Sequence, residues 1–145
     1  FEMLKVGADK AITFDVEQAL RFDGYTAAYL QYTGARINSI LRKAKVKIPK
    51  SINFKNLAEP KEMGLINKLA KYPEVVVSAG INYNPSELAK YLFELAQELN
   101  DYYHAVPVLK TKTEVKLARL ALITAVEQTL KNGLGLLGIE TMAEM

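Results

Sequence analysis

The sequence predicts an all-α fold, a bundle of about five helices, and three observations support this prediction. Apolar residues recur at spacings of three, four and seven over most of the chain, which is the period of one helix face. Helix-start signals precede these stretches, and prolines or glycines follow them. No alternation of apolar and polar residues continues long enough to indicate a β-strand.

Composition indicates one globular domain and excludes several kinds of site. The 145 residues are 50% hydrophobic and 24% charged, which excludes a disordered chain. Because the chain has no cysteine and one histidine, His104, we expect no disulfide, no thiol nucleophile and no metal site. No apolar run approaches the roughly 20 residues of a membrane span, so we expect no membrane partner and a cytoplasmic location. The start at Phe1, without initiator methionine or signal peptide, suggests a piece of a longer polypeptide.

The first half of the chain predicts one long helical region followed by a loop. Residues 1–14 have no clear period. The pattern is helical over residues 15–45, with a break or helix start at residues 23–26 (Asp-Gly-Tyr-Thr). Beyond this break, one aliphatic stripe recurs at spacings of seven, four and three: Leu30, Ile37, Leu41 and Ala44. Residues 46–59 are rich in proline, serine and asparagine and predict a loop.

Four more helices are predicted in the second half. Short helices are expected over residues 60–71 and from Pro73 onwards, because proline suits a first helical turn. Residues 84–87 (Asn-Pro-Ser-Glu) are a strong helix start, and Pro107 ends that helix. Behind this start runs a leucine seam of Leu88, Leu92, Leu95, Leu99, Tyr102 and Val106. Residues 111–114 (Thr-Lys-Thr-Glu) predict a capping box for a last long helix, with Gly133, Gly135 and Gly138 at its end.

The sequence contains no recognisable catalytic signature. It lacks a glycine-rich phosphate loop before a helix, a Gly-x-Ser-x-Gly motif and a His-Glu-x-x-His motif. Glu94 and Glu98 are i,i+4 neighbours, which is typical of a solvated helix face, and His104 is expected to be a structural or rim residue. We therefore predict no catalytic residue in this chain.

Basic residues are concentrated in one segment. Eight basic residues and one acidic residue between Arg36 and Lys61 give this segment a net charge of +7, although the whole chain carries only +3. Such a segment suits phosphate groups, because neutralised phosphates release their counterions. A solvated lysine-rich loop would show the same charge.

A second face of the helix over residues 25–45 is aromatic and cationic. At about 100° per residue, five side chains fall inside an arc of about 60°, roughly 120° from the aliphatic stripe. They are Tyr25, Tyr29, Tyr32, Arg36 and Lys43. Tyrosine rings and arginine planes stack on unpaired bases, but tyrosines also pack against a second helix with their hydroxyls at the rim. Tyr103, one position off the leucine seam, leaves the same two alternatives.

Motifs spread from about Phe14 to Met145 match one known family in their order. They are residues 19–26 (Ala-Leu-Arg-Phe-Asp-Gly-Tyr-Thr), 29–32 (Tyr-Leu-Gln-Tyr), 35–44 (Ala-Arg-Ile-Asn-Ser-Ile-Leu-Arg-Lys-Ala), 92–97 (Leu-Phe-Glu-Leu-Ala-Gln), 103–109 (Tyr-His-Ala-Val-Pro-Val-Leu), 118–122 (Ala-Arg-Leu-Ala-Leu), 131–134 (Lys-Asn-Gly-Leu) and 136–140 (Leu-Leu-Gly-Ile-Glu). Together they resemble the helical, DALR-type anticodon-binding domain at the C-terminus of arginyl-tRNA synthetases.

The resemblance implies a domain that binds the anticodon loop of tRNA-Arg, and it assigns the residues of that site. They are Tyr29, Tyr32, Arg36, Tyr103 and Met145. We also expect phosphate contacts from Lys43, Lys45 and Lys47. Residues 1–14 are then expected to be a remnant of the preceding catalytic or connective region, and residues 15–145 the anticodon-binding domain.

The intact protein would resemble an ATP-dependent arginine–tRNA ligase. This chain lacks both class I synthetase signatures (His-Ile-Gly-His-like and Lys-Met-Ser-Lys-Ser-like), so we expect it to be inactive alone and to need no cofactor. Arginine and ATP would meet only the missing catalytic domain. Two alternatives remain: a helical protein-interaction bundle, and the corresponding domain of a related class I synthetase such as the cysteinyl or methionyl enzyme.

Overall fold

The computed structural model describes residues 1–49 and 51–142, and its regular structure over these residues is entirely helical. After a single short turn, α1 (Val16–Ala19), come the five helices of the bundle. They are α2 (Ala27–Ala44), α3 (Pro60–Ala70), α4 (Tyr72–Ile81), α5 (Pro85–Ala105) and α6 (Thr113–Leu136). A 3₁₀ turn, η1 (Phe54–Asn56), interrupts the loop between α2 and α3. The predicted all-α bundle is confirmed.

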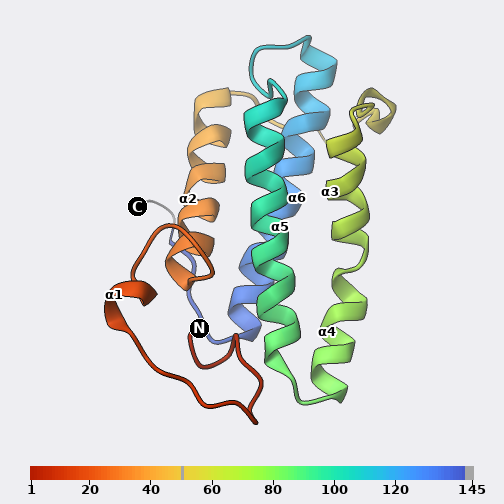
Figure 1. Ribbon diagram of the computed structural model, residues 1–145. Helices are drawn as coiled ribbons and strands as arrows, with labels where there is room; N and C mark the ends of the chain where they lie inside the picture. The colour runs from red at the N-terminus through yellow and green to blue at the C-terminus, as the bar shows by residue number, and fades with distance from the viewer. Residues whose placement is uncertain (50, 143–145) are drawn as a thin grey trace.

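Helix α5 is the centre of the bundle and contacts α2, α3, α4 and α6. In Figure 1, α5 (green to teal) stands between α2 on one side and α3 with α4 on the other, with α6 behind it. Helices α2 and α5 run in the same direction, so both end where α3 and α6 begin. The loop before α3 and the α5–α6 connection, far apart in the sequence, therefore lie at one end of the molecule.

The leucine seam of α5 forms the core, as predicted. All six of its members are buried: Leu88, Leu92, Leu95, Leu99, Tyr102 and Val106. The helix start is also where it was predicted, with Asn84 as N-cap and Pro85 in the first turn. One detail differs, because the Asn84 side chain bonds the side chains of Ser86 and Glu87 and caps no backbone N–H.

Helix α6 shows two departures from the predicted helix ends. It begins at Thr113 with Lys112 as N-cap, too late for the hydroxyl of Thr111 to cap it, so the predicted capping box is wrong. Gly133 lies inside the helix, where a Cβ would collide with the side chain of Leu92, so glycine allows α6 to approach α5 closely. Gly138, at φ +72°, ends the helix: its N–H donates to Gly135 O and the N–H of Ile139 to Leu134 O, a Schellman motif.

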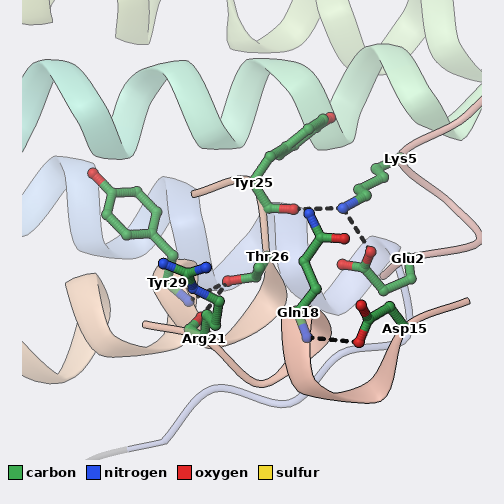
Figure 2. Close-up of polar contacts among 8 residues, drawn as sticks. All are labelled: Glu2, Lys5, Asp15, Gln18, Arg21, Tyr25, Thr26 and Tyr29. Atoms are coloured by element: carbon green, nitrogen blue, oxygen red, sulfur yellow. Dashed lines mark hydrogen bonds and ion pairs between the residues drawn. The ribbon is translucent and has the colours of Figure 1, made fainter. Parts of the chain in front are cut away.

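The helical region predicted over residues 15–45 is divided, because the chain turns between α1 and α2. Thr26 is the N-cap of α2: its hydroxyl accepts from the Tyr29 backbone N–H at 3.1 Å and donates to Arg21 O at 2.7 Å. Tyr25 precedes the helix and is therefore not part of its aromatic face, which corrects the prediction. Figure 2 shows this cap, and shows Lys5 reaching the Tyr25 carbonyl oxygen, a bond of 2.8 Å.

A buried ion pair connects three of the helices. Glu62 of α3 is 0% exposed and Arg119 of α6 is 6% exposed, and Arg119 Nε donates to Glu62 Oε1 at 2.6 Å. The Tyr102 hydroxyl of α5 donates to the same oxygen at 3.4 Å, and the Glu59 backbone N–H donates to Oε2 at 2.9 Å. Arg119 also donates to the carbonyl oxygen of Pro107 at 2.9 Å. Each ion thus has several partners inside the core.

We expect removal of one member of this pair to be far more damaging than removal of both. Arg119→Met or Glu62→Met leaves an uncompensated buried charge and should lower the free energy of unfolding by about 3–5 kcal/mol. The double variant should be less destabilised than the sum of the single ones, which urea unfolding would measure. Lys90→Ala, which breaks the exposed Lys90–Glu94 pair, is the control and should change stability by about 0–1 kcal/mol. Additive effects would contradict the coupling.

Three tyrosine hydroxyls make the fold sensitive to alkali. Burial, with Glu94 and Glu2 nearby, raises the pKa of Tyr25 to about 12, and burial also raises the pKa of Tyr91 and Tyr102. An unfolded tyrosine ionises near pH 10, so the unfolded chain loses these protons first. The stabilisation from keeping them neutral is complete below about pH 10 and is lost as pH rises towards the folded pKa values.

Stability measured by urea unfolding should therefore fall from about pH 10 upwards. Tyr25→Phe should make this fall shallower without lowering stability at pH 7, because the Tyr25 hydroxyl is buried and has no hydrogen-bond partner among the described residues. Tyr83→Phe, at a side chain that is 92% exposed, should leave the profile unchanged. An identical profile for Tyr25→Phe and the parent chain would contradict the assignment to Tyr25.

Candidate nucleic-acid interface

Helices α2 and α5 bring one row of polar and aromatic side chains from each helix together. The two helices run side by side in the same direction. Side chains three or four positions apart on one helix lie on one face, so a row on α2 can face a row on α5. The α2–α5 face consists of Tyr29, Tyr32 and Arg36 from α2 and Asn100 and Tyr103 from α5.

The Asn100 carboxamide is the hub of this face. Its Nδ2 donates to the Tyr29 hydroxyl oxygen at 2.8 Å, and its Oδ1 accepts from Arg36 at 3.2 Å. A longer bond of 3.4 Å runs from Nδ2 to the hydroxyl of Thr33, which is buried. Arg36 Cζ lies 5.0 Å from the centroid of the Tyr103 ring, a cation–π distance. Asn100, which the sequence did not indicate, therefore joins two of the predicted site residues, Tyr29 and Arg36, and Tyr103 joins them through Arg36.

Tyr29 is partly buried between α5 and a groove. Its ring packs 5.4 Å from the ring of Phe93, and Figure 2 shows both Tyr25 and Tyr29 directed toward α5. The groove has a volume of about 370 Å³, and Tyr29 and Asn100 line it together with Lys68 and three carboxylates of α5. These are Glu94, Glu98 and Asp101. Lys68 bonds Glu94 at 2.6 Å and balances one of the three carboxylates. The groove side of the face therefore keeps a net negative charge.

Tyr32 occupies the outer side of the face. Its side chain is 42% exposed, and its ring lies 6.0 Å from that of Phe22, which is also exposed. The chain returns beside α2 after α6, where the Gln31 side chain donates to the Glu140 carbonyl oxygen at 2.7 Å. Met145, the last predicted site residue, lies outside the described residues.

The predicted phosphate contacts lie apart from the tyrosines, at the end of α2. Lys43, Lys45 and Lys47 are all exposed. Lys110 and Lys112, in the α5–α6 connection, are exposed at the same end of the bundle. We call these five residues the basic end. The sequence indicated only the first three, because the α5–α6 connection reaches this end of the bundle through the fold and not through the chain.

The face thus offers aromatic rings, a guanidinium and a carboxamide, and exposed lysines lie apart from it at the basic end. Rings and guanidinium planes stack on unpaired bases, amides and guanidinium groups bond base edges, and lysines bond phosphates. Among residues 1–49 and 51–142, no cluster of three or more acidic or histidine side chains could hold a metal ion, and no helix is long and apolar enough to cross a membrane.

Comparisons with known proteins connect this geometry to a family. The family model described as "DALR anticodon binding domain" matches residues 30–145. The chain is 42% identical to an arginine–tRNA ligase of Phocaeicola vulgatus, over 99% of the chain and 24% of that protein, and 44% identical to that of Pyrococcus abyssi, over 100% and 24%. The arginyl-tRNA synthetase structure from Thermus thermophilus superposes with a TM-score of 0.92 at 36% identity, over 99% of this chain and 25% of that one. The chain therefore spans about a quarter of the length of these relatives.

Proposed function

The chain belongs to the DALR anticodon-binding domain family, with arginine–tRNA ligases as its relatives, and from this premise we propose that its α2–α5 face binds the anticodon loop of tRNA-Arg. The observation that carries the proposal is one connected group near the exposed ring of Tyr32: Asn100 bonds Tyr29 and Arg36, and Arg36 lies over the ring of Tyr103. Relatives that are arginine–tRNA ligases favour this ligand over that of another class I synthetase.

Base contacts and phosphate contacts are separated on the molecule. The α2–α5 face would read unpaired anticodon bases by stacking and hydrogen bonding, with Met145 as a further contact. The basic end would hold the RNA backbone, where each lysine acts through its charge and carries no sequence information. This division predicts different behaviour for variants of the two groups.

The longer protein is proposed to be a cytoplasmic arginine–tRNA ligase that uses ATP, arginine and tRNA-Arg. The chain described here would supply tRNA binding to that enzyme, whereas arginine and ATP would bind elsewhere in it. Residues 1–14 would then belong to the connection with the catalytic part; their boundary at residue 15 remains a prediction.

Arg36→Ala should relax anticodon discrimination. We expect the preference of the 145-residue chain for tRNA-Arg over a transcript with one changed anticodon base to fall by about 1–3 kcal/mol. Lys47→Ala is the contrast: it should weaken both transcripts alike and reduce the slope of log K against log salt by about 1. Equal binding of both transcripts by the parent chain would refute the proposed function, and circular dichroism would verify that the variants fold.

Tyr32→Ala should remove a stacking surface and weaken binding of tRNA-Arg by about 1–3 kcal/mol, whereas Tyr32→Phe should keep most of the affinity because it keeps the ring. The matched control is Tyr83→Ala, since Tyr83 is 92% exposed and lies in the α4–α5 turn, away from α2. Fluorescence anisotropy with a labelled anticodon stem–loop would measure both. A loss of similar size for Tyr83→Ala would mean that the two rings are not distinguished by the RNA.

A further inference from the structure

We infer that Asn100 is a positioning residue that makes Tyr29 and Arg36 present hydrogen-bond donors to the RNA. This inference rests on the proposed function. Asn100 is partly buried, and one carboxamide bonds three side chains of α2. It therefore sets the orientation of two predicted base contacts, Tyr29 and Arg36.

The orientation of the carboxamide follows from its partners. A guanidinium group has donors and no acceptor, so the atom of Asn100 that meets Arg36 is the oxygen. The amide nitrogen is then directed to the other side, where it donates to the hydroxyl oxygens of Tyr29 and Thr33. Only one of the two flipped arrangements satisfies all three partners.

This orientation determines what Tyr29 offers. Because the Tyr29 oxygen accepts from Asn100, the phenolic proton is not used in that bond. No acceptor for it occurs among the hydrogen bonds of the described residues. The proton is thus left for a ligand, and Tyr29 acts as a donor on the edge of the groove.

In the same orientation, Asn100 bonds the Arg36 guanidinium without neutralising its positive charge. Its partner on α5 is a neutral amide, although Glu98 and Asp101 line the adjoining groove. One edge of the guanidinium is held by Asn100 and its plane by Tyr103, which leaves its remaining donors for a ligand. A carboxylate at position 100 would form an ion pair with this charge.

The Tyr29 hydroxyl and the Arg36 guanidinium, both bonded to one carboxamide, offer donors, and this selects the chemical class of the ligand group. They complement the acceptor-rich edge of an unpaired base, such as the O2 and N3 atoms of cytosine or the O6 and N7 atoms of guanine. They do not complement an exocyclic amino group. We therefore assign to Tyr29 and Arg36, as oriented by Asn100, the recognition of a base through its acceptor atoms.

Asn100→Asp reverses this arrangement with almost no change in shape. The new carboxylate would accept a hydrogen bond from the Tyr29 hydroxyl and form an ion pair with Arg36. Both donors would then be directed to residue 100 and not to the RNA. The matched control is Gln97→Glu: Gln97 is an exposed amide one turn earlier on α5 that lines the same groove, and it makes no hydrogen bond with the described residues. Both variants add one negative charge beside the face, so general repulsion of RNA is present in both and cannot by itself distinguish them.

The experiment measures binding of the 145-residue chain to tRNA-Arg and to transcripts with one changed anticodon base. We expect Asn100→Asp to lower the ratio of the two affinities about tenfold or more, whereas Gln97→Glu should weaken both RNAs by one common factor. Asn100→Ala, which releases both side chains without adding a charge, should lower the ratio as well and covers the case in which the aspartate variant does not fold.

A double-mutant cycle shows whether Asn100 acts through Arg36. In the Arg36→Ala background, Asn100→Asp should lower the ratio of the two affinities by a smaller factor than in the parent chain. The loss that remains is the one due to the changed orientation of Tyr29. If the parent chain discriminates but Asn100→Asp behaves as Gln97→Glu does, this inference is overturned and the proposed function stands. If the parent chain binds all transcripts alike, the proposed function itself fails.

Discussion

The arrangement of the bundle depends on the buried pair of Glu62 and Arg119. Two charges taken out of water are tolerated only when their partners are all in place, so α3, α5 and α6 must meet in one register. Tyr102 joins this network, and Tyr103 is the next residue on the same helix. The rotation of α5 that places Tyr102 in this network therefore also directs Tyr103 to the α2–α5 face.

Much of the fold could be predicted from periodicity and local helix signals. The leucine seam of α5 is buried as its spacing implies, because a helix with one apolar stripe must cover that stripe. Helix ends were less predictable. The hydroxyl of Thr111 is available as a cap, yet α6 begins later, and Gly133 serves the approach of Leu92 instead of ending the helix. Such choices depend on packing between helices, which a local pattern does not contain.

The candidate site shows the same division. Helical geometry correctly separates the aliphatic stripe of α2 from its aromatic and cationic side, and it gives the direction of Tyr29, Tyr32 and Arg36. It does not give the burial of each side chain. Tyr29 and Arg36 are partly buried against α5, whereas Tyr32 is exposed, because α5 covers only one side of this aromatic and cationic face. The two alternatives weighed for these tyrosines are thus compatible, since a ring can pack on α5 and still border a groove. The role of Asn100 could not be predicted from the sequence, because it lies in contacts with another helix; the spacing of three from Tyr103 is the only local signal.

The hydroxyl of Thr26 has a mechanical consequence. It is bonded on one side to Arg21 O and on the other to the backbone N–H of Tyr29, while Lys5 holds the neighbouring carbonyl of Tyr25. The Thr26 hydroxyl therefore ties Arg21 to the first turn of α2, and Lys5 is tied to the residue that precedes the N-cap. A displacement of the segment before α2 is therefore coupled to the backbone of Tyr29 through two bonds, of 2.7 and 3.1 Å, that meet at one hydroxyl. The N-cap of α2 thus couples the incoming chain to the first turn of the helix, from which the ring of Tyr29 projects.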